Sequence, residues 1–307
     1  MNGPSVLTVI LNYNKQEDVL DAVKSALEVD YSNHQILVVD NSSTDGSWEV
    51  LRKTYPDVSM IQTSTNLGAP SGRNAGWRYA QDHYQFDYIF FLDDDAIVEK
   101  KAIQNFVDAL EIDKQGGIAC GKGYTRYPSK TFNSTGIQSN LYTGVIRDIG
   151  AGEEDIGQYE EKRYVAACGA FGLFIRADLF EELKGFDETF NPYGWEDVDL
   201  CFRAKKAGFK TLYLPSATIY HKGTKIGRKP LPHYEQAKVK NYLHLIRQHA
   251  SFTQKVCIFL FLPFRVLLLS IQLISQGHGN IIGAQLKGFF VGLTFKNEST
   301  YPGWKSK

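Results

Sequence analysis

The chain has 307 residues, 43% hydrophobic and 22% charged, which supports a sizeable buried core and excludes wholesale disorder, collagen and low-complexity sequence. Its formal charge of zero is unevenly distributed, because residues 1–221 carry 21 basic and 32 acidic side chains whereas residues 222–307 carry 13 and 2. The acidic body makes nucleic acid an unsuitable partner, and the basic end is typical of a segment that meets an anionic surface.

The cysteines and the first residues indicate a cytosolic protein. Cys120, Cys168, Cys201 and Cys257 are widely spaced and form no C-x-x-C pair, so buried reduced thiols are expected rather than a zinc cluster or a redox pair. An apolar run begins at once, at residues 6–11, with no basic region before it. We therefore expect no secretory signal.

Three apolar runs in the first hundred residues each end in polar side chains. They span residues 6–11, 36–39 and 88–92, and helix-like segments separate them. Such alternation is typical of buried parallel strands in an α/β sheet. Because the carboxyl ends of parallel strands share one edge, where such sheets bind ligands, we expect the polar tips to meet there. The tips are Asn12-Tyr13-Asn14, Asp40-Asn41-Ser42-Ser43 and Asp93-Asp94-Asp95.

The other elements are weaker patterns. Glycine-rich residues 66–74 precede a helical pattern at 75–80, and such a loop allows a ligand to approach the backbone closely. Residues 115–165 are rich in Gly, Tyr, Ser and Thr and predict loops and short strands. Regular patterns return afterwards, with strands at 170–175 and 211–214 and helices at 177–184 and 195–207.

Three consecutive carboxylates follow the third apolar run. At a sheet edge, Asp93, Asp94 and Asp95 repel one another unless a cation lies between them, and such hard oxygen ligands suit Mg²⁺ or Mn²⁺ shared with a phosphate. A solvated acidic turn is the alternative. An EF-hand is disfavoured, because Val98 stands where its glycine belongs and Gln104 where its bidentate glutamate belongs. The strand before the triplet favours the metal and phosphate interpretation.

A second acidic group, formed by Glu196, Asp197 and Asp199, opens a predicted helix about a hundred residues later. Carboxylates at a helix N-terminus also stabilise the helix dipole, so a structural role is the alternative to a catalytic one. His221 follows a predicted strand and is a candidate metal ligand, although a single histidine is more often structural. Each of these patterns is weak by itself.

In order, these motifs resemble the family 2 glycosyltransferases. The resemblance covers about residues 4–222 and depends on the ordered combination rather than on one motif. It implies a GT-A fold, which is a nucleotide-sugar-binding α/β domain with a mostly parallel sheet, and a reaction that inverts the anomeric centre. The motifs are Leu11-Asn12-Tyr13-Asn14, Val38-Val39-Asp40-Asn41-Ser42-Ser43-Thr44-Asp45-Gly46, Asn66-Leu67-Gly68, Gly72-Arg73-Asn74-Ala75-Gly76, Leu92-Asp93-Asp94-Asp95, Gly185-Phe186-Asp187-Glu188, Trp195-Glu196-Asp197-Val198-Asp199-Leu200 and His221.

The resemblance also implies roles for individual residues. Asp197, with Glu196, matches the catalytic E-D motif and is the expected general base, because a carboxylate must accept the proton of an attacking sugar hydroxyl. Asp95 is the expected direct metal ligand, with Asp93 and, as in some members, His221, and Mn²⁺ or Mg²⁺ there would stabilise the leaving nucleoside diphosphate. The expected nucleotide-sugar-binding residues are Asn12, Tyr13, Asp40, Asn41, Arg73, Asp93 and Asp94, with a salt bridge as the alternative role for Arg73. The expected acceptor-binding residues are Tyr193 and Trp195.

Residues 150–159 resemble a segment of the rhamnosyltransferase-type members that build bacterial surface polysaccharides. Rhamnose is therefore one expected donor sugar, other hexoses are the alternatives, and UDP or dTDP is the favoured nucleotide. The resemblance leaves the linkage position open.

The C-terminal segment differs in character from the body. Residues 222–255 contain eight basic side chains and one acidic one, and the apolar blocks 256–264 and 266–274 follow, divided by Arg265. Together with Pro263, this arginine makes a poor membrane-spanning helix, so amphipathic helices that lie in the membrane interface are the preferred prediction. Packing on the catalytic domain or on a second subunit is one alternative, and spanning the membrane is the other.

These inferences predict a metal-dependent, inverting hexosyltransferase that is peripheral on the cytoplasmic face of the cell membrane and adds a sugar to a lipid-linked glycan. Residues 1–222 would form the GT-A domain, and residues 223–307 a basic, apolar helical tail. Within the domain, residues 1–99 would be the nucleotide-binding half and 100–222 the acceptor-binding half. An oligomer is compatible with the sequence.

Two other functions are considered. A non-catalytic sugar- or nucleotide-binding module would lose nothing on Asp197→Asn. A sugar-nucleotide pyrophosphorylase shares a similar nucleotide fold, but the first apolar run ends in Asn12-Tyr13-Asn14 rather than in a glycine-rich G-x-G-x-R loop.

Overall fold

The computed structural model describes residues 3–223, 231–275 and 277–294. The strands are β1 (Val6–Asn12), β2 (His34–Asp40), β3 (Ser59–Gln62), β4 (Tyr88–Asp93), β5 (Ala96–Val98), β6 (Gly116–Tyr124), β7 (Phe132–Ser134), β8 (Ile137–Asn140), β9 (Val145–Asp148), β10 (Arg163–Val165), β11 (Gly172–Arg176) and β12 (Lys210–His221). The helices are α1 (Gln16–Leu27), α2 (Ser47–Thr54), α3 (Ala69–His83), α4 (Ala102–Ile112), α5 (Ala177–Glu182), the 3₁₀ turn η1 (Glu188–Phe190), α6 (Glu196–Lys206), α7 (Pro232–His249), α8 (Phe252–Ser275) and α9 (Asn280–Thr294).

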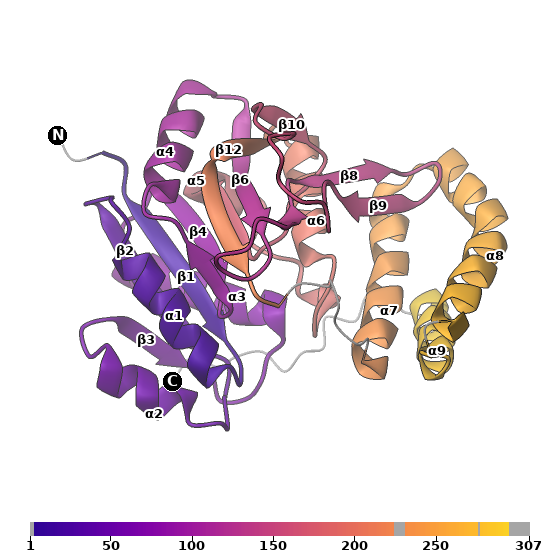
Figure 1. The fold of residues 1–307 in the computed structure, drawn as a ribbon, viewed down its shortest axis with the longest axis horizontal. Coiled ribbons are helices and arrows are strands. Elements are labelled where there is room, and N and C mark those ends of the chain that lie inside the picture. The colour runs from indigo at the N-terminus through magenta and orange to yellow at the C-terminus, as the bar shows by residue number, and fades with distance from the viewer. Residues whose placement is uncertain (1–2, 224–230, 276, 295–307) are drawn as a thin grey trace.

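Within the described residues, ten strands form one sheet in the order β10-β12-β6-β11-β4-β1-β2-β3, with β5 paired to β12 and β7 to β6. The strands β4, β1, β2 and β3 are parallel, and their register sets Asn12 beside Asp40 and Leu11 beside Asp93. The three predicted strand tips therefore end at one edge of the sheet. Strands β8 and β9 form a separate hairpin that reaches toward the C-terminal helices (Figure 1).

Helices cover both faces of the sheet, because successive residues of a buried strand point to opposite sides. In β1, Leu7 and Val9 pack into a core shared with α3, α5 and α6, whereas Val6 and Ile10 pack into a second core shared with α1 and α4. Each such side chain stabilises the fold by about 1.5–3 kcal/mol through burial. The first core also holds three of the four thiols that were predicted to be buried, Cys120, Cys168 and Cys201, whereas Cys257 in α8 is only half-buried.

The loops and short strands predicted for residues 115–165 are present as β7 to β10, and β6 is the exception. Instead of a short strand, it is a nine-residue strand buried between β12 and β11. Its glycines obscure the apolar pattern, but the packing requires them. A Cβ on Gly121 would lie 2.3 Å from the carbonyl oxygen of Ala217, and one on Gly123 would lie 2.8 Å from that of Ser134.

Strand β12 is longer than the short strand predicted at 211–214. Its register against β6 shifts between Leu214 and Thr218, so the strand continues beyond Pro215. It then pairs with β5, which sets His221 beside Ala96. This extension carries the histidine to the polar edge of the sheet.

The C-terminal segment is helical, as predicted, and its helices differ in their surroundings (Figure 1). Helices α7 and α9 pack closely, since a Cβ on Gly288 would lie 2.3 Å from the carbonyl oxygen of Gln236. Helix α8 is one continuous helix of 24 residues across the two predicted apolar blocks, and its 18-residue apolar window has a mean hydropathy of 2.3 and is 7% buried. Among the described residues it is the helix long and apolar enough to cross a membrane. Residues 224–230, 276 and 295–307 of the predicted tail lie outside the described residues.

Candidate active site

Two aspartates and a histidine from distant parts of the chain meet at the polar edge of the sheet. Asp93 ends β4, Asp95 lies in the turn that follows, and His221 ends β12. Nε2 of His221 lies 3.1 Å from Oδ1 of Asp95 and 3.6 Å from Oδ2 of Asp93. One ligand atom of each residue lies within 4.8 Å of the other two. Two carboxylates and an imidazole are a donor set that fits Mn²⁺ or Mg²⁺.

Neighbouring groups hold His221 in this orientation. Its ring stacks on Phe171, with centroids 4.8 Å apart and an angle of 1° between the planes. Its Nδ1 contacts Nδ2 of Asn133 at 3.2 Å, which leaves Nε2 to face the aspartates. A Cβ on Gly223 would lie 2.3 Å from Oδ2 of Asp95, so the chain after His221 closes over the cluster. Contacts of this kind to the far ring nitrogen are what orient metal-binding histidines.

The aspartate cluster carries excess negative charge. Nζ of Lys15 lies 2.6 Å from Oδ2 of Asp95. Burial lowers the pKa of Lys15, but the Asp95 carboxylate outweighs burial and raises it above the ordinary value. Burial and the charge of Asp95 raise the pKa of Asp94 to about 8, although the Tyr13 backbone N–H donates to its Oδ2 at 3.0 Å. A divalent cation would relieve this repulsion between carboxylates.

Arg73 connects the two acidic motifs. From α3, its buried guanidinium donates to Oδ1 of Asp93 at 2.6 Å and to Oε1 of Glu196 at 3.1 Å, and it lies over the ring of Phe186. Glu196 also accepts from the backbone N–H of Gly194 at 2.7 Å. Glu196 is therefore held by two groups of the protein itself. Arg73 forms salt bridges to Asp93 and Glu196, which is the role predicted as the alternative to binding the phosphates of the donor.

Asp197 follows Glu196 in the first turn of α6 and is half-buried. Its Oδ1 accepts from the N–H of Val198 at 2.8 Å, and its Oδ2 accepts from the N–H of Ala170 at 3.3 Å. Because Glu196 is held in place, the neighbouring Asp197 is held as well. Its carboxylate faces Ala170, in the segment that leads into β11.

The first two strand tips form a buried polar network. Nδ2 of Asn12 donates to Oδ2 of Asp40 at 2.8 Å, and Oδ1 of Asp40 accepts from the N–H of Ser43 at 2.9 Å and from Nε2 of Gln62 at 3.1 Å. Oδ1 of Asn12 is buried and has no hydrogen-bond partner. Tyr13 is 41% exposed at the rim. The hydrogen bonds of this network are thus already formed without a ligand. The unpartnered Oδ1 of Asn12 belongs to the network, and the ring of Tyr13 lies beside it.

Asn41 supports residues 66–68, the part of the predicted glycine-rich loop that is a loop, because residues 69–74 form the start of α3. Its Nδ2 donates to Oδ1 of Asn66 at 3.0 Å and to the carbonyl of Gly68 at 3.2 Å, and its Oδ1 accepts from the N–H of Leu67 at 2.9 Å. It is 2% exposed. Asn41 therefore acts by holding this loop in place.

The aromatic pair before Glu196 contacts helix α7. Trp195 has a φ of 76°, which is the left-handed region, and its Nε1 donates to the carbonyl of Lys238 at 3.0 Å. Its ring lies against Tyr242, whereas Tyr193 lies against Tyr234. The structure separates the two predicted acceptor residues, because Trp195 lines the cavity beside the β8–β9 hairpin and Tyr193 is not among the residues of that lining.

Helix α7 holds the segment that leads to the catalytic motif. The side-chain amide of Asn241, which is fully buried, donates to the carbonyls of Phe190 at 2.5 Å, Tyr193 at 3.0 Å and Gly194 at 3.2 Å. At the end of α7, Nε2 of His249 lies 2.7 Å from Oδ1 of the buried Asp199. Asp199 is therefore held by the last turn of α7.

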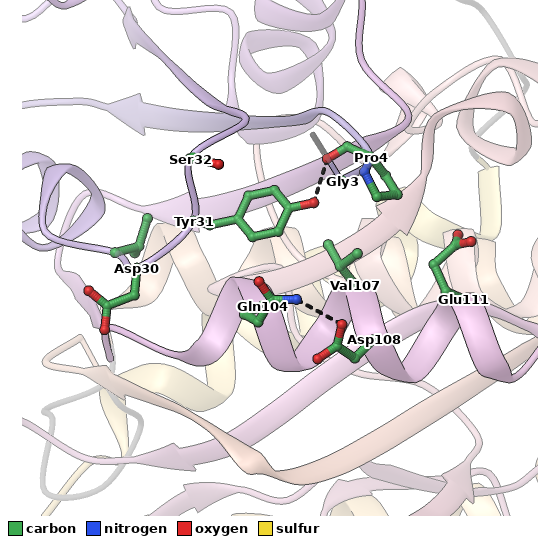
Figure 2. Close-up of a pocket in the computed structure, with 10 residues that line it drawn as sticks. Gly3, Pro4, Asp30, Tyr31, Ser32, Gln104, Val107, Asp108 and Glu111 are labelled. Atoms are coloured by element: carbon green, nitrogen blue, oxygen red, sulfur yellow. Dashed lines mark hydrogen bonds between the residues drawn. The ribbon is translucent and has the colours of Figure 1, made fainter. Parts of the chain in front are cut away.

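Two cavities lie outside the aspartate cluster. One, of about 720 Å³, is lined by Gly3, Tyr31, Gln104 and Asp108 among others, at the opposite edge of the sheet where β1 and β2 begin (Figure 2). There Tyr31 donates to the carbonyl of Pro4 at 2.5 Å. The other, of about 620 Å³, lies between the β8–β9 hairpin and Trp195. Only the second adjoins the predicted catalytic motif.

Four residues that shape this site have no recognisable sequence pattern. Lys15, Phe171 and Asn133 contact the aspartates or His221, and Asn241 holds the carbonyls before Glu196. Each acts through a partner at least 47 positions away in the chain. These residues could be identified from the sequence only if their contacts with the distant motifs were already known.

A parallel sheet whose polar strand ends face an Asp-His cluster, with a second carboxylate motif across from it, defines a GT-A nucleotide-sugar-binding fold. The chain belongs to the family described as glycosyl transferase family 2, whose model matches residues 8–183. Sugar transfer is thus its chemistry, which excludes the pyrophosphorylase alternative.

Relatives and solved structures agree with this assignment. The N-acetylglucosaminyl-diphospho-decaprenol L-rhamnosyltransferase of Mycobacterium tuberculosis is 27% identical over 236 residues, which cover 70% of this chain and 76% of that protein. A mannosyltransferase of Pyrobaculum calidifontis, solved with GDP-Man and Mn²⁺, matches 96% of this chain and 88% of its own with a TM-score of 0.60 and 14% identity. The structure of GalNAc-T7 with UDP, GalNAc and Mn²⁺ matches 80% of this chain but only 48% of its own, with a TM-score of 0.63 and 14% identity. At such identities the two structures share the fold alone.

Proposed function

We propose that this protein is a metal-dependent, inverting glycosyltransferase that moves a sugar from a nucleoside-diphosphate donor to a hydroxyl of a lipid-linked glycan. The observation that carries the proposal is the joint placement of the Asp93, Asp95 and His221 cluster and of Asp197, connected through Arg73 and Glu196. One motif can hold the leaving group while the other accepts a proton. A non-catalytic binding module has no need of the second motif.

Asp197 is the proposed general base. Its carboxylate lies in the first turn of α6, where two backbone N–H groups orient it. It accepts the proton of the acceptor hydroxyl as the oxygen attacks the anomeric carbon, and the nucleoside diphosphate leaves from the opposite face, which inverts that carbon. Glu196 is the proposed positioning residue, because Arg73 and Gly194 hold it.

Asp93, Asp95 and His221 are the residues that would hold Mn²⁺ or Mg²⁺. The cation, when bound, neutralises charge that develops on the leaving diphosphate. Asp95 would carry the larger share, since its Oδ1 lies nearest to His221, while Lys15 contacts its other oxygen. Lys15 is a basic group beside the place where the diphosphate would lie.

The proposed nucleotide site is the network at the first two strand tips. The buried Asp40 and Asn12 form the floor of this site, and the exposed Tyr13 covers the base at its rim. Asn41 shapes the adjoining loop, and Asp94 contributes through its contact with the Tyr13 backbone. UDP and dTDP are the favoured nucleotides, and rhamnose is one candidate sugar, as in the mycobacterial relative's name.

The proposed location is the cytoplasmic face of the cell membrane. Helix α8 exposes large apolar side chains, and the mycobacterial relative is named for a lipid-linked acceptor. Apolar side chains entering the bilayer beside a basic segment would hold the active site at the headgroups, where such an acceptor is presented. Trp195 and Tyr193 are the proposed acceptor-side aromatics.

A thermal-shift panel tests the proposal. UDP, dTDP, GDP and CMP are each added with and without Mn²⁺ to the wild type and to Asp95→Ala, because a ligand of the native state raises the unfolding temperature. We expect one nucleotide to stabilise the wild type in a metal-dependent way and to lose that effect in the variant. No shift with any nucleotide would contradict a donor site, and a shift without transfer activity would favour the binding module.

A further inference from the structure

The cavity of about 620 Å³ beside Trp195 has the walls of a sugar site. Its aromatic walls are Trp195 and Tyr159, and its polar walls come from the β8–β9 hairpin and the loop after it. The volume lies in the range of small-molecule sites, which combine apolar or aromatic surface with a few polar groups. The remaining polar lining residues are Gln138, Arg147, Asp148 and Glu153.

Two walls of this cavity lead directly to Asp197. Trp195 lies two residues before it, at the residue that begins α6. The opposite wall begins at Ile137, whose backbone N–H donates to the carbonyl of Ala167 at 2.7 Å, three residues before Ala170, which donates to the Asp197 carboxylate. The cavity therefore adjoins the proposed base rather than the aspartate cluster.

The charges of the lining favour a neutral ligand. Asp148 and Glu153 outnumber Arg147, so a nucleoside diphosphate would meet net negative charge there. Hydroxyl groups of a sugar instead donate to carboxylates and accept from a guanidinium or an amide. With its amide turned so that the oxygen faces Arg147, Gln138 accepts from that guanidinium at 3.0 Å, and Glu153 accepts from the hydroxyl of Tyr159 at 3.0 Å, so both groups are held in place.

The hairpin is fixed against the C-terminal helices. The hydroxyl of Tyr242 in α7 donates to the carbonyl of Gly144 at 2.6 Å. Leu141 packs on a small core that contains Ile246 of α7 and Ile258 of α8. The β8–β9 hairpin, which lines the cavity, reaches from the body toward α7 and α8 (Figure 1). A glycan carried on a lipid would reach the cavity from that side.

We propose that this cavity binds a pyranose ring of the acceptor glycan, and that Gln138 and Glu153 determine acceptor binding. The inference rests on the proposed function. It assigns acceptor binding to the β8–β9 hairpin as well as to Trp195. Tyr193 lies outside the cavity and acts through its contact with α7.

The test uses the full chain and a synthetic acceptor, N-acetylglucosaminyl diphosphate on a short citronellyl chain, chosen from the name of the mycobacterial relative. Transfer from the nucleotide sugar that the thermal-shift panel identifies is measured for the wild type, Gln138→Ala and Glu153→Ala. We expect the acceptor KM to rise about fivefold to tenfold in each variant, as for one lost hydrogen bond, while the donor KM and the nucleotide shift stay unchanged. Gln104→Ala, in the cavity at the opposite edge, is the matched control.

Saturation-transfer NMR on the same acceptor supplies a second readout that needs no turnover. We expect transfer to the sugar ring in the wild type and in the control, and its loss in the Gln138→Ala/Glu153→Ala double variant. A double variant that binds the acceptor as the wild type does, or a wild type that binds a nucleotide with Mn²⁺ but not this acceptor, would overturn the inference. A wild type that no nucleotide stabilises refutes the proposed function itself, and this inference with it.

Discussion

The catalytic body and helix α8 use similar residues in opposite ways. Phe90 and Phe91 of β4 are completely buried, whereas Phe259 and Phe264 of α8 are 52% and 68% exposed. The sheet can bury both faces because helices cover them, and its polar groups then collect at the strand ends. Helix α8 has no such cover in the described chain. The body thus completes its own core, whereas α8 leaves most of its apolar surface exposed.

Helix α7 joins the body to helix α9 through polar contacts. Asn241 is fully buried against three carbonyls of the body, and His249 pairs with Asp199 at 2.7 Å. Arg247 on the same helix donates to the carbonyl of Gly292 in α9 at 2.8 Å. This comparison predicts that four features can be disrupted separately. They are the general base, the metal site, the contact of α7 with the body and the exposed surface of α8.

The largest expected effect is on the transfer rate alone, without a change in nucleotide binding or liposome binding. Asp197→Asn removes the proposed base but keeps the shape of the side chain, so transfer should fall by about a thousandfold, within the range for general base catalysis. The nucleotide-induced thermal shift and liposome binding should not change. The rate is measured with saturating donor. A variant that retains more than a tenth of the wild-type rate would contradict this role.

The next effect concerns the metal site. Asp95→Ala removes the carboxylate that contacts both His221 and Lys15, and transfer should fall by about a hundredfold as charge on the leaving group loses its support. EDTA should reduce the wild type to a similar level, and Mn²⁺ should restore only the wild type. Asp82→Ala, an exposed substitution on α3, is the control. Equal rates with and without EDTA would exclude metal dependence.

A smaller effect is expected at the junction. Asn241→Ala leaves three carbonyls with one donor fewer, which should lower the free energy of unfolding by about 2 kcal/mol. Urea denaturation measures this change, with Gln81→Ala on the surface of α3 as the control. Because those carbonyls lead to Glu196, kcat should fall more than the donor KM rises. Unchanged stability would show that α7 is only loosely attached to the body.

The smallest effect is expected on α8. Leu260→Ser on a side chain that is 68% exposed should leave stability unchanged but weaken binding to anionic liposomes by about 1.5 kcal/mol, or roughly tenfold. Flotation of wild type and variant with anionic vesicles measures it. Ile112→Ser, on a residue of α4 that is 80% exposed, controls for general hydrophobicity. Equal loss in both variants would exclude α8 as the membrane contact.

The sequence by itself determined the parallel strands, their polar tips and the family. Continuous apolar runs that end in Asn12, Asp40 and Asp93 are local patterns, and parallel register then requires the tips to meet. The helical tail was equally predictable, because composition alone reveals it. In contrast, β6 escaped prediction, because glycines that avoid clashes with Ala217 and Ser134 hide the strand pattern.

Tertiary structure alone decided the partners at the site. Arg73 pairs with Glu196 across 123 positions, and Lys15 pairs with Asp95 across 80. The extension of β12 to His221 depends on a register shift that follows from its neighbours, and Asn241 finds its carbonyls only when α7 packs. Periodicity records which face of an element is buried, but it contains no information on which distant side chain lies opposite. For this reason the motifs were visible in the sequence, while the network that positions them was not.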